Sequence, residues 1–302
     1  MIKRVIDISE KSYIHMKNKQ LLIERKNQLI ASIPIEDLGV VILQNRAIVI
    51  TQAVIIACQE NNVILVFCDK QHLPYSVILP ISDANSLHTR ILIEQTKVTL
   101  PTRKRLWQQV VQHKITEQAL TLKLLNKNSK SIEHIIKKVK TGDKENHEAQ
   151  AAKKYWRILM GDDFRRDPKN GNVNALLNYG YAIIRAVIAR AIVGSGLHPA
   201  LGLHHHNQYN GLCLADDLME PFRPWVDYCV YQMIESNQTL EINKETKKVL
   251  LGLLSENVTW KEKTLPFMVA SHYVTATLKR AYNDNKERMI YPSLVSREQK
   301  LI

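Results

Sequence analysis

The chain has 302 residues, of which 45% are hydrophobic and 24% charged, and its formal net charge is +13. This composition is typical of a soluble globular protein that is long enough for two domains with buried cores. The positive surplus favours a polyanionic partner such as nucleic acid, because Lys and Arg contacts with phosphates dominate non-specific affinity. A generally basic protein without such a partner is the alternative that composition leaves open.

The apolar runs and the cysteines indicate a cytoplasmic protein. Polar and charged residues, such as Gln59, Glu60, Arg185 and Arg190, interrupt the longest apolar runs, so we expect no membrane span. The N-terminus lacks the apolar core of a signal peptide. The four cysteines occur singly, without a C-x-x-C pair, which favours free thiols over disulfides or a structural zinc site.

The first eighty residues have the pattern of β-structure. Short runs that alternate in character, or that are continuously apolar and β-branched, predict strands at 4–8, 12–16, 20–24, 29–34, 40–43, 63–67 and 75–79. Between them, residues 51–59 have an apolar helical face and Thr51 as a candidate N-cap.

After Ser86 the apolar spacing changes to three and four residues, which is the helical period. Helices are predicted at 89–98, 104–125, 131–139, 147–159, 174–193, 215–236, 244–254 and 265–283. Pro101 separates the first two, and Pro221 and Pro224 predict a bend in the helix over 215–236. The predicted fold is therefore α+β. A small β-rich N-terminal domain, residues 1–82, precedes a larger all-α domain, residues 88–302, with a linker near residues 80–88.

Positive charge is concentrated in the helical part. Residues 1–90 hold 10 Lys and Arg against 8 Asp and Glu, whereas the remaining residues hold 32 against 21. Aromatic side chains such as Trp107 and Trp156 lie among these charges and can stack on unpaired bases at a duplex end. The helical part is therefore the predicted nucleic-acid face.

Residues 196–224 carry the strongest chemical signal. They contain three consecutive histidines and then three acids: His204, His205, His206, Asp216, Asp217 and Glu220. Asp217 and Glu220 share one helix face and can hold one divalent cation, and Asp216 competes for this role. At most two of the histidines can be ligands, because successive side chains point in different directions. Acids that complement a helix dipole are the alternative interpretation.

A third acid has to come from elsewhere, and Glu148 is the best candidate. It begins a predicted helix, and the small residues after it allow another element to approach closely. Glu145 is an equal competitor, and capping is the commoner role of an acid at such a position. Basic residues follow at Lys153, Lys154, Arg157, Arg165 and Arg166. One imidazole with two or three carboxylates suits Mn²⁺ or Mg²⁺ better than structural zinc.

Four segments, taken in order and spacing, resemble one known family. They are NHEAQAAKKYW (146–156), NALLNYGYAIIR (174–185), GLHPALGLHHHNQYN (196–210) and LADDLMEPFRP (214–224). The chain is similar to the CRISPR-associated adaptation integrase, the first of the two adaptation proteins. It resembles the compact form from systems with a single-protein effector nuclease, and the β-then-α layout extends the resemblance over the whole chain.

The resemblance implies a metal-dependent triad of Glu148, His205 and Glu220. The family pattern places its histidine two residues before an Asn, which is Asn207 here, and Asp217 stands where the family often has a further acid near the metal. The chain departs from the pattern at two positions. His206 stands where many relatives have Arg, and Glu220 replaces an Asp.

The resemblance also implies the reaction and the partners. The 3′-hydroxyl of a spacer fragment would attack a phosphodiester at the repeat boundary, with Mg²⁺ or Mn²⁺ as cofactor. The implied partners are double-stranded DNA, a second copy of the chain, the small second adaptation protein in a heterohexamer, and the effector nuclease. The residues expected to contact DNA are Lys153, Lys154, Arg157, Arg165, Arg166, Asn207 and Arg223.

Two functions from other classes compete with the integrase hypothesis. A non-catalytic DNA-organising protein would bind DNA with strong salt dependence and show no metal-dependent cleavage. A metal hydrolase of small phosphoesters would need the same ligands but no basic domain. The histidines and acids argue against the first alternative, and the basic helical part argues against the second.

Overall fold

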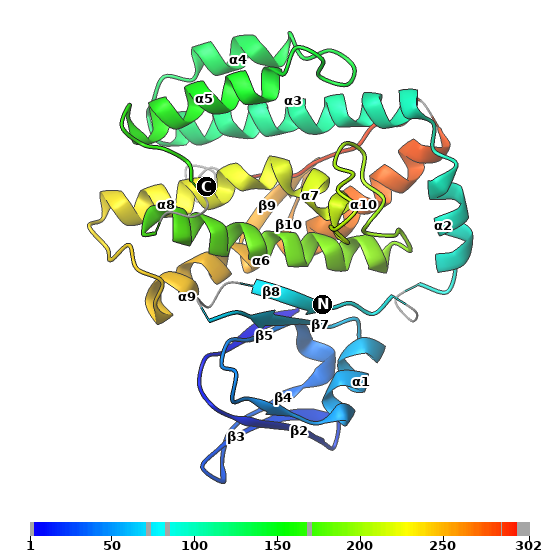
Figure 1. Cartoon of the computed structure of the whole chain (residues 1–302), viewed down its shortest axis with the longest axis vertical. Coiled ribbons are helices and arrows are strands. Elements are labelled where there is room, and N and C mark those ends of the chain that lie inside the picture. The colour runs from blue at the N-terminus through cyan, green and yellow to red at the C-terminus, as the bar shows by residue number, and fades with distance from the viewer. Residues whose placement is uncertain (1–2, 71–73, 82–84, 168–170, 285, 295–302) are drawn as a thin grey trace.

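The structure, a computed structural model, describes residues 3–70, 74–81, 85–167, 171–284 and 286–294 (Figure 1). Strands fill most of the chain up to residue 78, and helices dominate from residue 88 onward, which confirms the predicted α+β fold. The strand-rich part lies at one end of an elongated molecule and the helices at the other (Figure 1). The predicted domain limits, 1–82 and 88–302, stay predictions, since residues 1–2, 82–84 and 295–302 lie outside the described ranges.

The N-terminal part consists of two four-stranded sheets, with strand orders β1-β5-β7-β8 and β4-β3-β2-β6. Its elements are β1 (Arg4–Ile8), β2 (Tyr13–Lys17), β3 (Gln20–Arg25), β4 (Gln28–Pro34), β5 (Leu38–Leu43), β6 (Val49–Ile50), α1 (Gln52–Glu60), β7 (Ile64–Cys68) and β8 (Pro74–Ile78). Every predicted strand and the helix over 51–59 lie within two residues of these bounds. The short strand β6, which pairs in parallel with β2, was missed.

The continuous apolar run of β5 reflects a position in which both of its faces are covered. All six of its residues are buried, and it pairs in parallel with β1 and with β7. Successive side chains of a strand point to opposite faces. Val41 and Leu43 accordingly join the core of the N-terminal part, while Val40 and Ile42 join the core of the helical part. The first sheet is thus the layer that both parts share.

The helical part is built around α6, which packs against β7 and β8 on one side and α7, α8 and α10 on others. Its helices are α2 (His88–Thr96), α3 (Leu100–Leu124), α4 (Lys130–Ile136), α5 (His147–Met160), α6 (Val173–Gly194), α7 (Cys213–Met219), α8 (Arg223–Glu235), α9 (Lys244–Gly252) and α10 (Phe267–Asn283). A 3-10 turn, η2 (Glu220–Phe222), separates α7 from α8 and gives the predicted bend at Pro221.

Among the described residues, α6 alone has the length and apolar composition of a membrane span, contrary to the expectation based on Arg185 and Arg190. However, 83% of its apolar window is buried inside the protein. Such burial is typical of the core helix of a globular fold. α6 therefore explains the strong apolar signal without a membrane.

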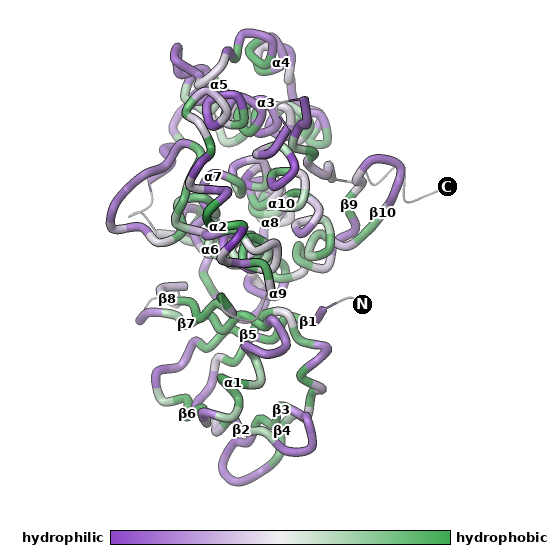
Figure 2. Tube along the Cα trace, turned by 90° about the vertical axis from the view of Figure 1, so that its right-hand side faces the viewer, coloured by the Kyte–Doolittle hydropathy of each residue, from purple (hydrophilic) through white to green (hydrophobic). Residues whose placement is uncertain are grey.

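The second part is not entirely helical, which corrects the prediction. A small antiparallel sheet of order β10-β9-β11 is formed by β9 (Asn257–Trp260), β10 (Lys263–Pro266) and β11 (Ser293–Leu294). The β9–β10 hairpin projects from the body of the protein and has a hydrophilic tip (Figure 2). Its turn places Lys261 at φ 55°, a conformation for which Asn or Gly would have been the usual sequence signal.

Candidate functional site

Two of the predicted acids meet at a lysine that the sequence analysis did not single out. Lys114 Nζ, from α3, lies 2.6 Å from Glu148 Oε1 on α5 and 2.6 Å from Glu220 Oε2 in η2. All three side chains are largely buried, with exposed fractions of 11%, 26% and 7% respectively. The two carboxylates therefore share a single cation, although they are far apart in the sequence.

Local structure fixes the backbone at both acids. Asn146 adopts φ 52° as the N-cap of α5, and its side chain accepts a hydrogen bond from the amide of Ala149. The carboxylate of Asp143 accepts the amides of His147 and Glu148, at 2.9 and 3.0 Å. Glu148 thus lies in the first turn of a doubly capped helix, where its side chain leans toward α3.

The position of Glu220 follows from the break between α7 and α8. Pro221 stands in the first turn of the 3-10 segment that begins at Glu220, and proline is compatible with that position because no amide is needed there. Arg223 Nε donates to Glu220 Oε1 at 2.9 Å. Both oxygens of Glu220 therefore face cations, with Lys114 at one and Arg223 at the other.

His205 lies in the connection between α6 and α7, and Asp217 on α7 holds it in place. The ring Nδ1 is 2.7 Å from Asp217 Oδ1, and the same carboxylate accepts the amides of Leu203, His204 and His205. Asp217 is fully buried, whereas 45% of the His205 side chain is exposed. With Nδ1 engaged, Nε2 is the ring nitrogen that can reach another ligand.

The alternative site residues have other partners. The ring of His204 stacks on Trp107, with centroids 4.3 Å apart and planes at 6°. Asp216 accepts hydrogen bonds from both Nε and Nη2 of Arg185, at 2.5 and 3.0 Å. Glu145 is exposed and lies 3.3 Å from Lys140. Of the competing groups, only His206 lies beside His205 at the edge of a cavity.

The electrostatics of the site favour the ionised form of Glu220. Burial acts to raise the pKa of Glu220, but Lys114 and Arg223 hold that pKa below its ordinary value. Burial likewise acts to lower the pKa of Lys114, yet Glu220 and Glu148 raise it above the usual range. The hydrogen bond that His205 donates to Asp217 is the main cause of a raised pKa at His205, and the charge of Glu220 adds to it. The positive charge of His205 is thus favoured by Asp217, which it contacts, and by the charge of Glu220.

The residues predicted to contact DNA differ in how they are engaged. Lys153 and Lys154 are exposed on α5, and Asn207 is exposed in the loop before α7. Arg166 donates to Asn174 at 2.8 Å and to Asn178 at 2.6 Å.

The remaining arginines have partners within the protein. Arg157 pairs with Asp162, Arg165 donates to the carbonyl of Asp162 at 2.6 Å, and the guanidinium of Arg223 lies 4.6 Å from the ring centre of Tyr181. Lys153 and Lys154 are therefore better placed for phosphate contacts than the arginines.

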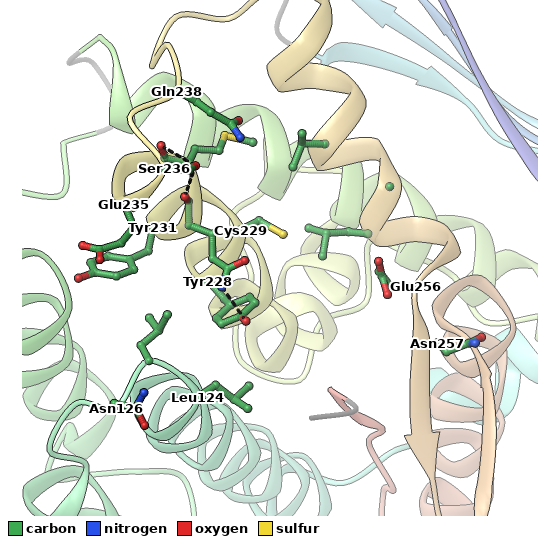
Figure 3. A pocket seen from close by; sticks show the side chains of 16 residues that line it. Leu124, Asn126, Tyr228, Cys229, Tyr231, Glu235, Ser236, Gln238, Glu256 and Asn257 are labelled. Carbon is green, nitrogen blue, oxygen red and sulfur yellow. Dashed lines mark hydrogen bonds between the residues drawn. The ribbon is translucent and has the colours of Figure 1, made fainter. Parts of the chain in front are cut away.

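One cavity formed by the described residues lies away from this chemistry. It has a volume of about 740 Å³ and is lined by residues from the end of α3, from α8 and from the segment between α9 and β9, including Tyr228, Tyr231 and Glu256 (Figure 3). None of the predicted site residues lines it. A smaller cavity of about 230 Å³ borders His205 and His206, so the chemistry favours the smaller cavity.

The donor set suits a divalent cation, although Lys114 stands between its acids. Among the residues that the structure describes, no three His, Cys, Asp or Glu side chains are already arranged as a metal site. Two carboxylates that converge on one positive charge, together with an imidazole that Asp217 orients, nevertheless belong to the ligand types that Mg²⁺ and Mn²⁺ accept. Lys114 itself lies in the sequence QHKITEQ, which contains no metal or nucleotide motif.

Solved structures share this fold over nearly the whole chain. A casposase bound to integration product matches with a TM-score of 0.78, 19% identity and coverage of 96% of this chain and 92% of the other. A chain of a Cas6-RT-Cas1–Cas2 complex matches with a TM-score of 0.73 and 17% identity, covering 94% of this chain and 35% of the other.

Sequence relatives identify the family. A CRISPR-associated endonuclease Cas1 from Neisseria meningitidis is 31% identical over 293 residues, which cover 96% of this chain and 95% of the relative. The family model described as CRISPR associated protein Cas1 matches residues 6–258. This match and the relative over the full length agree with the resemblance carried by the four motifs, and the chain therefore belongs to the CRISPR-associated protein Cas1 family.

Proposed function

We propose that this protein is a metal-dependent DNA endonuclease and integrase of CRISPR adaptation. It would insert spacer DNA into the repeat array by transesterification. In this reaction the 3′-hydroxyl of the spacer loses its proton and forms a new bond to phosphorus, while the bond from that phosphorus to the 3′-oxygen of the repeat strand breaks and that oxygen leaves as a hydroxyl. The observation that carries the proposal is the convergence of Glu148 and Glu220, from α5 and η2, on one positive charge at 2.6 Å each. The Neisseria relative, a CRISPR-associated endonuclease, supports the same class of activity.

Glu148, Glu220 and His205 are the residues that would hold Mg²⁺ or Mn²⁺. When bound, such a cation supplies Lewis-acid stabilisation of the negative charge that develops on a phosphodiester during displacement. Asp217 acts on the imidazole, because its hydrogen bond at Nδ1 fixes the ring and leaves Nε2 for the cation. We therefore assign Asp217 the role of orienting His205 in place of the direct ligand role predicted from the sequence.

The protein's own residues would also position the DNA. Lys153 and Lys154 follow Glu148 on the same helix and are exposed, so a phosphate backbone bound along α5 would pass close to the acids. We retain Arg157, Arg165, Arg166, Asn207 and Arg223 as further contacts, with some of their present partners exchanged for phosphates. The net charge of +13 and the similarity to a casposase bound to integration product support DNA as substrate.

The proposed assembly is a homodimer joined to the small second adaptation protein in a heterohexamer, and the effector nuclease is a further partner. The similarity to a chain of the Cas6-RT-Cas1–Cas2 complex supports a Cas2 partner. Large apolar side chains are exposed on the second N-terminal sheet, including Leu29 at 58% and Val49 at 55%, and they support a dimer contact there. The proposed location is the cytoplasm, in keeping with four free cysteines.

Substitution of the three ligands tests the activity. We expect Glu148→Gln, His205→Ala and Glu220→Gln each to lower Mn²⁺-dependent strand transfer by at least about 100-fold, the scale of losing electrostatic stabilisation of a transition state. DNA binding at low salt should persist. Glu145→Gln is the matched control, since Glu145 lies just before α5. Its carboxylate is 3.3 Å from the exposed Lys140 and 3.7 Å from His147.

The same assay separates the competing functions. Retained strand transfer in all three ligand variants would exclude the proposed site. DNA binding by the parent protein without metal-dependent nicking would point to a DNA-organising role. Hydrolysis of a small phosphodiester that DNA fragments do not inhibit would point to the small-molecule hydrolase.

A further inference from the structure

Lys114 occupies the place between the two acids where a divalent cation would be expected. Its ammonium contacts Glu148 Oε1 and Glu220 Oε2 at the same distance, 2.6 Å. The two oxygens therefore lie within about 5.2 Å of each other, whereas two ligands of one Mg²⁺ span at most about 4.2 Å, so a side-chain movement of about 1 Å would bring both oxygens to one ion. No other cation is described at Glu148, whereas Glu220 also has Arg223.

A buried lysine between the buried carboxylate of Glu220 and the partly buried carboxylate of Glu148 neutralises a charge that would otherwise destabilise the fold. Two ionised acids this close repel each other strongly when water is largely excluded. Glu220 is 7% exposed and Lys114 is 11% exposed, so solvent can screen the repulsion only weakly. The pair of acids consequently depends on a positive charge between them, whether that charge is an ammonium or a metal ion.

We propose that Lys114 is an internal counter-ion that holds Glu148 and Glu220 together before the divalent cation arrives, and that it must leave them for the cation to bind. This inference rests on the proposed function, because it takes the two acids to be metal ligands. Lysine suits the task, since a single ammonium on a flexible four-carbon stem can swing away without movement of α3. Arg223 keeps its contact with Glu220 Oε1 and can hold that side chain while the exchange takes place.

The proposal predicts two opposite effects of Lys114→Met, which keeps the length of the side chain and removes its charge. Mn²⁺ affinity of the full-length protein, measured by isothermal titration calorimetry, should rise by about tenfold or more, because the metal no longer displaces an ammonium. In EDTA the Tm should fall by at least about 4 °C, since the buried Glu220 and the partly buried Glu148 lose their shared counter-ion. Saturating Mn²⁺ should restore most of that loss.

Lys123→Met is the matched control. Lys123 lies on the same helix and pairs with Glu133 at 2.7 Å, but 58% of its side chain is exposed. The control should leave Mn²⁺ affinity unchanged and shift the Tm little, because exposed ion pairs contribute little to stability. Unchanged or weaker Mn²⁺ binding by Lys114→Met would overturn the proposal.

A measurement on the parent protein keeps the proposal testable if Lys114→Met does not fold. Acetylation by an amine-reactive reagent, followed by peptide mass spectrometry, reports whether Lys114 is held in ion pairs. Labelling of Lys114 should be slow in EDTA and faster in saturating Mn²⁺, while Lys123 reacts equally in both. Equal labelling of Lys114 in the two conditions would count against displacement.

The ligand variants distinguish failure of this inference from failure of the proposed function. If Glu148→Gln and Glu220→Gln abolish Mn²⁺ binding while Lys114→Met leaves it unchanged, the metal site stands and the role of Lys114 is wrong. If neither ligand variant weakens Mn²⁺ binding, the proposed metal site itself is wrong.

Discussion

Asp217 shows how one buried side chain can organise a loop that carries chemistry. Its carboxylate has no exposed surface and accepts the amides of Leu203 at 2.5 Å, His204 at 3.0 Å and His205 at 3.2 Å, besides the ring of His205. A carboxylate is needed here because all four partners are donors. An amide at this position would place its own N–H₂ group against some of those donors.

Asp217→Asn should therefore destabilise the protein and impair the site. We expect the free energy of unfolding to fall by about 1–3 kcal/mol, the cost of leaving buried donors unsatisfied, and strand transfer to fall with it. Urea denaturation gives the first quantity. Asp216→Asn is the neighbouring control for stability, because Asp216 accepts from the half-buried groups of Arg185 and Asn210. If Asp217→Asn unfolds at the same urea concentration as the parent protein, this account is wrong.

Asp227, on α8, gives a prediction about pH. Burial raises its pKa to about 7, although Tyr181, which donates to it, acts in the opposite direction. In the unfolded chain the pKa of an aspartate carboxyl is about 3.9. Between these values the folded protein binds more protons than the unfolded chain, so this contribution to stability is present at low pH and is lost as pH rises to about 7.

Asp227→Asn cannot ionise and should remove that dependence. Between pH 5 and pH 7 its free energy of unfolding should decline less steeply than that of the parent, by up to about 1.4 kcal/mol per pH unit. Urea denaturation at three pH values measures the slope. Asp163→Asn, at an exposed position, should keep the parental slope. Parallel curves for Asp227→Asn and the parent would refute the assignment.

For individual residues, the sequence could predict the acids and the imidazole of the site but not the counter-ion of the acids. Glu148, His205 and Glu220 stand in motifs that resemble a family, and two of them meet in the structure. Lys114 stands in no motif, and one lysine among many on a basic chain gives no local signal. Its role depends on where α3 passes α5 and η2, which is a property of the packing.

Among the elements, α6 and α8 approach so closely that only glycine fits between them. A Cβ added at Gly180 would lie 2.4 Å from Val226 Cγ1 and 3.2 Å from Cγ2. Alanine would raise helix propensity by about 1 kcal/mol, but overpacking in a buried interface costs about 1–3 kcal/mol. The steric effect should outweigh the propensity.

Gly180→Ala is thus expected to lower stability, and Gly180→Ala with Val226→Ala should recover part of the loss from overpacking. Thermal and urea unfolding compare the single variants with the pair. Gly252→Ala, at the end of α9, has nothing within 4 Å of the added Cβ and should be neutral or stabilising. If Gly180→Ala instead stabilises the protein, the interface between α6 and α8 accommodates the extra methyl group at little cost.

Helices and strands were predicted correctly where the apolar pattern extends over many residues. They were missed where pairing with another strand creates the element. The buried run of β5 and the helical face of α6 follow from their own residues. Strands β6, β9 and β11 are short, with two to four residues, and exist because a partner strand lies beside them. Pro101 was expected to lie between two helices but occupies the first turn of α3, where proline is tolerated.

For the whole molecule, the positive charge predicts strongly salt-dependent DNA binding. Binding of a short duplex should weaken as salt rises from 50 to 200 mM, with a slope of log K against log salt of about −0.9 for each phosphate neutralised. Replacement of Lys153 and Lys154 by Gln should reduce that slope by about 2. Fluorescence anisotropy over a salt series measures it.

The control for this experiment carries the same change in charge at the other end of the molecule. Lys17 and Lys19 are exposed at the β2–β3 turn of the N-terminal part. Their replacement by Gln should leave the slope unchanged if DNA lies along the helical part. A similar drop in slope for both pairs would mean that the charge acts as a diffuse field without a defined binding face.

Arg190, on α6, connects elements that lie far apart in the sequence. It is 4% exposed, and its guanidinium donates to the carbonyl of Asn62 at 2.6 Å and contacts His272 Nε2 at 3.0 Å. Loss of the strand layer would leave this buried cation facing α10 without its carbonyl acceptor. Heating should consequently give a single calorimetric endotherm, and a fragment that contains α6 but lacks the strand layer should stay unstructured until the strands are supplied in trans.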